Sequence, residues 1–375
     1  MNETAKVVIG GGIIGLSIAW RLVKEGQNVT VVERGQVGQE ASRVAAGMLA
    51  ASAEVGYEEF ELYALCRESL RLWPNFALEL EQDSGINVDY RSNGTLIVAD
   101  DRDAAVALKR GFDFQKEHQY PVEWLTREET LALEPFLSPR IVASVFASED
   151  HAVDNRMVIK GLREAILRHG GVIKENSTVE SVDLSGTNVV VHVQGQDSVI
   201  ADTVVVAAGA WSRQIAGLPP EFVPPVRPVK GQILELKMER PFELNHVVRG
   251  RKAYLVPRTD GRLIVGATSE EMGFDKRMTA GGVHAVLDGA WDMVPGILDL
   301  ELSSIDVGLR PGSRDHQPIV GYSNDRRIFI ATGHYRHGVI LSAVTAVESA
   351  KSILSGNDSA VLRYFSPKRF SHLDV

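Results

Sequence analysis

The first part of the chain alternates between short apolar runs and a helical pattern. Apolar residues dominate 6–9 and 28–33, and over 12–25 they recur at every fourth position, on one face of a helix. Gly26 then ends the helical pattern, as glycine commonly does at a helix C-terminus. The pattern predicts a βαβ unit at the start of the chain.

Later segments repeat both patterns. Helices are predicted over 59–82, where Pro74 marks a break or a fresh first turn, and over 156–169, 280–294 and 339–354. Strands are predicted in GTLIVAD, NVVVHVQG, DTVVVAAGAW, GQILELKM, KAYLVPR, GRLIVGAT and RIFIATG. Strands that alternate with helices are typical of α/β proteins.

Two domains are predicted, because 375 residues exceed what one simple core usually fills. The proline-rich PPEFVPPVRP, residues 219–228, is predicted to be irregular and to cross between them. We expect an α/β fold in which a discontinuous, Rossmann-like nucleotide-binding domain carries an inserted antiparallel, β-rich substrate-binding domain. The nucleotide-binding domain is predicted over 1–85, 150–220 and 306–365, and the substrate-binding domain over 86–149 and 221–305.

Charge and cysteine content narrow the function classes. The chain has 40 Lys and Arg against 49 Asp and Glu, a net charge of −9, which argues against a basic face for nucleic acid. Cys66 is the single cysteine, so no intrachain disulfide can form, which fits a reducing compartment. The apolar N-terminal run lacks signal-peptide features and is far shorter than the roughly 20 residues of a membrane span. We expect a cytoplasmic protein that binds neither nucleic acid nor membrane.

A glycine fingerprint lies inside the βαβ unit. Gly10, Gly12 and Gly15 follow the first strand and open the helix, and Glu33 ends the second strand. The first glycine allows the tight turn, the second a close approach of a pyrophosphate, and the third helix–strand packing. The helix N-terminus offers free N–H groups to phosphate, and the acid can bind ribose hydroxyls. The motif predicts dinucleotide binding.

Two features favour FAD over NAD. The fingerprint stands at the very start of the chain, and a second glycine-bearing strand–loop–helix, IFIATGHYRHGVILS, lies near its end. FAD is long, so its flavin end needs a second binding element. The helix after Gly338 could direct backbone N–H groups at the flavin pyrimidine carbonyl and stabilise negative charge on the reduced ring.

Arg310 is the candidate anchor for a substrate. It lies in GLRPGSRDHQPIVG, residues 308–321, and is predicted to occupy a glycine- and proline-framed loop. A fixed guanidinium fork suits a carboxylate, although a solvated loop arginine is the simpler alternative. Tyr254 could add a hydroxyl, although core packing is its simpler alternative. His334 and His337 are interpreted as flavin-neighbouring or structural, since the histidines show no metal-ligand spacing and no metal is expected.

The motifs together identify a family. KVVIGGGIIG, VVER, AAGMLA, VVVAAGAWS, PVKGQ, AYLVPR, GRLIVGAT, GLRPGSRDHQPIVG and ATGHYRHGVIL appear in this order, up to about residue 350. The sequence resembles the glycine oxidases, within the D-amino-acid oxidase and sarcosine oxidase group of flavoproteins. This resemblance implies an FAD enzyme. Monomeric sarcosine oxidases attach flavin through a later cysteine, and none follows Cys66, so FAD is expected to be non-covalent.

The resemblance also implies site residues. Arg310 would bind the substrate carboxylate with Tyr254, Arg336 would act on the substrate side of the flavin, and Met48 would line the pocket. Ser269 and Lys252 depart from the glycine oxidase pattern near the pocket or its mouth, which bears on substrate size. The residues expected at FAD are Gly10, Gly12, Ile13, Ile14, Gly15, Glu33, Arg34, Ala41, Ser42, Ala46, Gly47, Met48, Val179, Gly209, Trp211, His334, Tyr335, Arg336, His337, Gly338, Val339 and Ile340.

The implied reaction is oxidative deamination of glycine, sarcosine and small D-amino acids. Hydride passes to flavin, O2 becomes H2O2, and the imine gives an oxo acid and ammonia or amine, or feeds thiamine thiazole synthesis. The family implies a homotetramer. Three alternatives stay open: a dehydrogenase on this fold that passes electrons to a quinone or partner, a non-catalytic flavin-binding subunit, and an NAD-dependent dehydrogenase.

Overall fold

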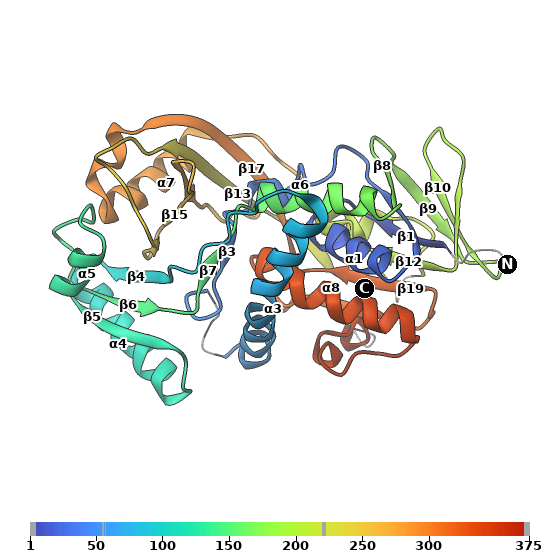
Figure 1. Cartoon of the computed structure of the whole chain (residues 1–375), viewed down its shortest axis with the longest axis horizontal. Helices are drawn as coiled ribbons and strands as arrows, with labels where there is room; N and C mark the ends of the chain where they lie inside the picture. Colours follow the sequence, from blue (N-terminus) through green and yellow to red (C-terminus); the bar gives the residue numbers. More distant parts are fainter. Residues whose placement is uncertain (1–4, 55, 57, 220–222, 371–375) are drawn as a thin grey trace.

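A six-stranded sheet forms the centre of one domain in the computed structural model, which describes residues 5–54, 56, 58–219 and 223–370 (Figure 1). Its order is β18-β19-β12-β1-β2-β8, and all neighbours are parallel except β18 and β19. The strands are β1 (Ala5–Ile9), β2 (Asn28–Val32), β8 (Val172–Lys174), β12 (Thr203–Val206), β18 (Ile319–Tyr322) and β19 (Ile328–Thr332). The predicted βαβ unit is confirmed.

Both faces of this sheet are covered, which explains its nearly continuous apolar strands. Helices pack on one face, and a three-stranded sheet, in the order β11-β10-β9, packs on the other. The helices are α1 (Ile13–Lys24), α3 (Phe60–Ser84), α6 (Asn155–Arg168) and α8 (Gly338–Ser355). The three strands are β9 (Val179–Asp183), β10 (Val189–Val193) and β11 (Val199–Ala201). Adjacent strand residues alternate between the two cores, with Val8 facing the helices and Val7 the small sheet.

Pro74 does not break its helix. It lies inside α3, which runs unbroken from Phe60 to Ser84. Trp73 and Phe76 on either side of it are buried in the helical core. Their packing offsets the hydrogen bond that proline removes, so the predicted break is wrong at this position.

An antiparallel-rich sheet of eight strands forms the second domain, at the left of Figure 1. Its order is β17-β13-β16-β15-β14-β4-β6-β5, with only β14 and β4 parallel. The strands are β4 (Thr95–Ala99), β5 (Val122–Thr126), β6 (Ala143–Ala147), β13 (Val226–Lys237), β14 (Val247–Arg249), β15 (Tyr254–Pro257), β16 (Arg262–Gly266) and β17 (Glu301–Ser313). Its helices are α4 (Arg102–Glu117), α5 (Arg127–Leu133) and α7 (Ala280–Met293). The α/β fold class is confirmed.

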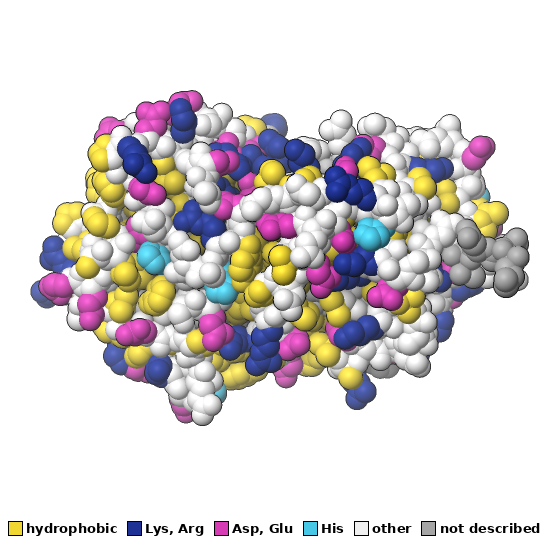
Figure 2. All heavy atoms as spheres, in the orientation of Figure 1, with side chains coloured by type: hydrophobic (Ala, Val, Ile, Leu, Met, Phe, Trp, Pro, Cys, Tyr) yellow, Lys and Arg dark blue, Asp and Glu magenta, His cyan; other side chains and the backbone are white. Residues whose placement is uncertain are grey.

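Short elements complete the chain and link the domains. They are α2 (Ala41–Val44), the paired strands β3 (Met48–Leu49) and β7 (His151–Ala152), and the 3-10 helices η1 (Gly209–Gln214), η3 (Pro295–Asp299), η4 (Arg363–Phe365) and η5 (Pro367–Phe370). Figure 2 shows basic and acidic side chains intermixed on this face of both domains.

A strand begins inside one segment predicted to be irregular, and another strand runs through a second such segment. Pro228 lies inside β13, opposite Pro311 of β17. Residues 219 and 223–225 of the proline-rich segment are irregular, as predicted, and residues 220–222 lie outside the described structure. β16 pairs with β13 only over residues 233–237. Pro228 therefore lies beyond the hydrogen bonds between β13 and β16, and its missing N–H group does not interrupt them. Arg310 likewise lies in β17, which the predicted domain boundary at residue 306 divides.

One described helix, α8, is long and apolar enough by length and composition to cross a membrane. However, 67% of its apolar window is buried inside the protein, where it packs against α1 and α3. The position of α8 is that of a core helix.

Candidate active site

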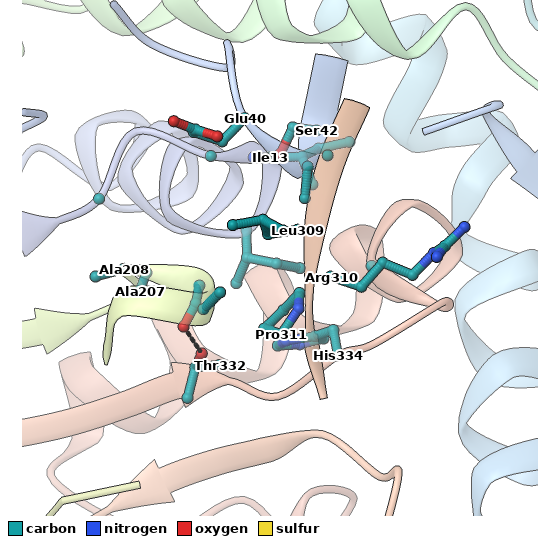
Figure 3. A pocket seen from close by; sticks show the side chains of 18 of the residues that line it. Ile13, Glu40, Ser42, Ala207, Ala208, Leu309, Arg310, Pro311, Thr332 and His334 are labelled. Carbon is teal, nitrogen blue, oxygen red and sulfur yellow. Dashed lines mark hydrogen bonds between the residues drawn. The ribbon is translucent and has the colours of Figure 1, made fainter. Parts of the chain in front are cut away.

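A cavity of about 470 Å3 runs along the seam between the two domains. Its walls come from the glycine turn before α1, the segment through α2 and β3, η1, strand β17 and the loop before α8. Figure 3 shows Ile13, Ser42, Leu309, Arg310 and His334 converging on it from these distant parts of the sequence. One cavity therefore joins the fingerprint, the C-terminal motif and the candidate substrate anchor.

Most of the predicted site residues line this cavity. They are Gly10, Gly12, Ile13, Ile14, Glu33, Arg34, Ala41, Ser42, Ala46, Gly47, Met48, Val179, Gly209, Trp211, Tyr254, Arg310, His334, Tyr335, Arg336, His337, Gly338, Val339 and Ile340. Gly15 lies behind the wall, where a Cβ would come within 2.1 Å of the Gly10 carbonyl oxygen. Its role is the close helix–strand packing that the fingerprint predicts.

The glycine turn forms an open cradle at one end of the cavity. Gly10 has φ of 109°, and a Cβ there would lie 2.4 Å from the Ala207 carbonyl oxygen. The Glu33 carboxylate accepts hydrogen bonds from the N–H groups of Gly11 at 2.8 Å and Gly35 at 3.0 Å, which fixes it at the cavity wall. The N–H group of Ile13 donates to Ser42 Oγ at 2.9 Å. The positive N-terminal end of α1 and a fixed carboxylate fit the pyrophosphate and ribose of a dinucleotide.

The other end of the cavity meets the start of α8. Gly338, Val339 and Ile340 line it, so the N-terminal dipole of a helix of 18 residues is directed at this end. Burial, with a small contribution from the neighbouring imidazole, lowers the pKa of His334 to about 3. Burial also lowers the pKa of His337 to about 4. Both imidazoles are therefore neutral at neutral pH, and the helix terminus supplies positive potential without them.

Arg310 is held by backbone carbonyls at the substrate-domain wall. Its Nη1 donates to the carbonyl oxygens of Thr268 at 3.1 Å and Lys230 at 3.4 Å. Burial raises the pKa of the Tyr254 phenol, although the nearby Arg310 guanidinium acts in the opposite direction. The phenol thus remains a hydrogen-bond donor beside a fixed cation, an arrangement suited to a carboxylate.

Two glycines that the sequence did not single out make room for this pair. A Cβ on Gly231 would lie 2.4 Å from Nη1 of Arg310, and one on Gly266 would lie 2.4 Å from Oη of Tyr254. Gly231 belongs to the motif PVKGQ and Gly266 to the motif GRLIVGAT. The sequence does not reveal which side chains pack against these glycines, because that depends on the pairing of the strands.

Glu54 is a cavity residue that the sequence reasoning missed. Burial raises the pKa of its carboxyl, but the cations Arg249 and Arg336 outweigh this effect, so the pKa lies below its usual value. Arg249 Nε also donates a hydrogen bond to Glu54. The sequence signal that could have indicated Glu54 is its position directly after the run of small residues AAGMLAASA, which forms part of the cavity wall. Glu54 is thus an ionised group at the substrate-domain side of the cavity.

Asp150 fixes the segment that carries Glu54. It is fully buried, and its carboxylate accepts hydrogen bonds from the N–H groups of Ala51 and Ser52 at 3.0 Å and of Ala53 at 2.7 Å. Three such bonds favour the ionised carboxylate, whereas burial raises its pKa, to about 7. Asp150 therefore holds the backbone directly before the cavity carboxylate.

Ser269 and Lys252 do not line the cavity. Ser269 is exposed, with Oγ 3.5 Å from the phenol oxygen of Tyr335, a cavity residue, so it lies near the mouth. Lys252 points toward α7 instead, where its Nζ contacts Asp288 at 2.8 Å and Asp292 at 2.9 Å. Lys252 lies before β15, outside the strand that directs Tyr254 into the cavity, and its side chain reaches the acidic face of α7 instead. Lys252 was expected near the pocket or its mouth, but its side chain does not line the cavity.

The fold and cavity define a two-domain dinucleotide-dependent protein, with the cofactor cradle in one domain and an anion anchor in the other. The family model DAO, FAD dependent oxidoreductase, matches residues 7–351. The chain belongs to this family, and FAD is its cofactor.

The similarity of the chain to glycine oxidases agrees with this assignment. The chain is 33% identical to the glycine oxidase of Geobacillus kaustophilus, over 91% of this chain and 90% of that protein. The crystal structure of a glycine oxidase from Geobacillus kaustophilus superposes with a TM-score of 0.90 at 32% identity, covering 98% of this chain and 99% of that one.

A second group of relatives is longer. The bifunctional protein ThiO/ThiG of Synechocystis sp. is 34% identical over 99% of this chain but only 55% of its own length. The chain thus spans about half the length of these bifunctional relatives.

Proposed function

We propose that this chain catalyses the oxidative deamination of glycine, sarcosine and small D-amino acids, with O2 as the final electron acceptor. The observation that carries the proposal is the Arg310–Tyr254 pair at the substrate-domain wall of the FAD cavity. The similarity to glycine oxidases over nine-tenths of both chains supports it. The products are H2O2 and an imine, which hydrolyses to an oxo acid and ammonia or amine.

Positioning is the main contribution of the protein. The guanidinium of Arg310 binds the substrate carboxylate, and the neutral Tyr254 phenol donates to the same group. Two fixed contacts restrict the α-carbon to one place in the cavity, which lowers the entropic cost of reaction. FAD, when bound, supplies the ring that accepts two electrons and a hydrogen from this carbon.

Proton removal from the amine does not need a side-chain base. The two buried histidines have pKa values of about 3 and about 4, so they accept protons weakly at neutral pH. Glu54 is also a weak base, because the cations Arg249 and Arg336 hold the pKa of its carboxyl below its usual value. A dry cavity disfavours the charged amine, so the substrate loses this proton as it binds.

The first test is anaerobic reduction of the bound flavin. Glycine, sarcosine, D-alanine and D-proline are mixed in turn with the FAD-loaded protein, and the flavin absorbance is followed. We expect glycine or sarcosine to bleach the flavin. Admission of air should then restore the colour and yield one H2O2 for each substrate molecule oxidised. Bleaching without peroxide would indicate a dehydrogenase, and no bleaching by any of the four would contradict the proposal.

Arg310→Ala tests the anchor. Loss of a buried charge-assisted contact costs roughly 2–5 kcal/mol, so KM should rise by about 30-fold or more while FAD stays bound. Arg227→Ala on the neighbouring strand β13 is the matched control, since Arg227 pairs with Glu271 at the surface. An unchanged KM in the Arg310 variant would remove the assignment.

The biological setting is proposed from the resemblance and the bifunctional relatives. The imine is expected to serve thiamine thiazole synthesis, in line with the ThiO/ThiG name of those relatives. We further propose a cytoplasmic homotetramer. Sedimentation of the purified protein tests the tetramer, and growth of a gene deletion without thiamine tests the pathway.

A further inference from the structure

A loop of the substrate domain reaches across the seam to the FAD domain. This loop, the strap, comprises residues 270–279 between β16 and α7. The Phe274 ring lies 5.5 Å from the Trp211 ring, and Nζ of Lys276 lies 2.8 Å from Oε2 of Glu40. Trp211 and Glu40 both line the FAD cavity. The strap therefore touches the cavity wall from outside at two points.

The two contact points are joined on the FAD-domain side by Arg34. Its Nη2 lies 2.7 Å from Oε1 of Glu40, and its guanidinium carbon lies 3.6 Å from the centroid of the Trp211 ring. The carboxylate of Glu40 thus holds one cation from each domain, one on each oxygen. These contacts, together with the strap backbone between Phe274 and Lys276, close a ring through Arg34, Glu40, Lys276, Phe274 and Trp211.

This ring lies at the adenosine end of the cavity. Arg34 directly follows Glu33, the fixed carboxylate at the end of β2 that is placed to bind ribose hydroxyls. Arg34, Glu40 and Trp211 all line the cavity here, whereas Arg310 lies at the substrate-domain wall.

The stems of the strap are held by hydrogen bonds to β13, whereas its tip is less buried. The Gln232 amide donates to Glu270 at 2.8 Å and to Oγ1 of Thr279 at 3.1 Å, and Lys230 and Glu270 exchange two backbone hydrogen bonds. The tip, in contrast, leaves Met272 51% and Phe274 43% exposed. A tip with so little burial opens at low free-energy cost while its stems stay in place.

We propose that the strap closes over the adenosine end of bound FAD, with Glu40 as its latch, so that FAD leaves only when the tip lifts. Phe274 and Lys276 then govern cofactor retention although they belong to the substrate domain. The inference concerns FAD alone and holds whichever amino acid is oxidised.

The experiment measures FAD release from the holoenzyme. An excess of an apoprotein that captures free flavin is added to the wild type, Lys276→Met, Phe274→Ala and the double variant. The change in flavin fluorescence with time gives the rate at which each protein releases FAD. Hydrogen exchange of peptides covering 268–279 reports separately whether the tip has loosened. Glu271→Gln is the matched control, because Glu271 lies in the same strap but pairs outward with Arg227.

A half-exposed ion pair or ring contact is weak, so each single variant should release FAD about two- to fivefold faster. The double variant should release it about tenfold faster, and the control should match the wild type. Added salt should speed release more in the wild type than in Lys276→Met, since the latch is screened.

Two results would overturn the proposal. Faster hydrogen exchange at the tip with unchanged FAD release would show that the strap does not retain FAD. Unchanged exchange and unchanged release in the double variant would show that these contacts do not hold the strap at all.

Discussion

At the scale of single residues, the site depends on glycines, whose lack of a side chain makes room, as much as on the functional side chains themselves. The sequence singled out Arg310 and Tyr254 because a framed cation and a phenol suit a carboxylate. It did not single out Gly231 and Gly266, because their role depends on strands that meet only in the folded sheet. Glu54 was missed for the same reason, since Arg249 and Arg336 are distant in sequence.

Gly231→Ala should impair substrate binding by displacing the guanidinium of Arg310. The new Cβ would lie 2.4–2.6 Å from the Arg310 guanidinium, so the guanidinium must leave its two carbonyl acceptors. KM should rise by about tenfold, in line with the roughly 1–3 kcal/mol cost of a disturbed polar contact, while FAD binding stays normal. Gly281→Ala is the control, since a Cβ there meets nothing within 4 Å. Equal KM values for the two variants would contradict the explanation.

The buried histidines predict how stability changes with pH. Their folded-state pKa values, about 3 for His334 and about 4 for His337, lie below the unfolded value of roughly 6.5. Between these limits the unfolded chain binds more protons, so stability falls as pH drops below 6.5, by up to about 1.4 kcal/mol per pH unit for each histidine.

Denaturant unfolding at pH 7 and pH 5 measures this effect. The loss of stability on acidification should be smaller in His334→Gln than in the wild type, because one depressed pKa has been removed. Equal losses in both proteins would show that His334 is not buried in its neutral form.

At the scale of elements, local patterns were predictable and long-range pairings were not. The glycine fingerprint, α1 and α8 follow from residues close in sequence, and each lies where the pattern predicts. The ladder of β13 and β17 joins segments some 80 residues apart, and its facing prolines argue locally against a strand. Tertiary pairing overrides that local preference, as core packing does for Pro74 in α3.

Asp154 has two roles that substitutions can separate. Its Oδ1 caps α6 by accepting from the N–H groups of Arg156 and Met157, and its Oδ2 binds Arg262 of the other domain. Asp154→Asn keeps the cap and loses the ion pair, so it should lower the free energy of unfolding by about 1–2 kcal/mol. Asp154→Ala loses both and should lower it by about 2–4 kcal/mol.

Thermal or urea unfolding of the FAD-loaded protein gives these values. Asp101→Asn is the matched control, because Asp101 caps α4 with its side chain but lies at the surface. The control should change stability by less than about 0.5 kcal/mol. If Asp154→Asn were as mild as this control, the ion pair to Arg262 would not join the domains.

At the scale of the whole molecule, the cavity exists because two domains meet along one seam. Arg156 of α6 binds Glu235 of β13 at 2.6 Å and Asp306 of β17 at 3.1 Å, which ties the domains together on one side. The strap ties them at the adenosine end. The length of the chain predicted two domains, and its order of strands and helices indicated which segments belong to each. It could not indicate the seam contacts, because each pairs residues that no periodicity relates.

The order of strands in the six-stranded sheet bears on how the protein is made. β1 is synthesised well before β19, which lies beside β12 in the sheet, and before α8, which covers α1. Until the ribosome has released these segments, the glycine cradle has no opposite wall, and the apolar faces of α1 and β12 lack their partners. Partly synthesised chains are therefore expected to expose aggregation-prone apolar surface, and to take up FAD only after α8 has been made.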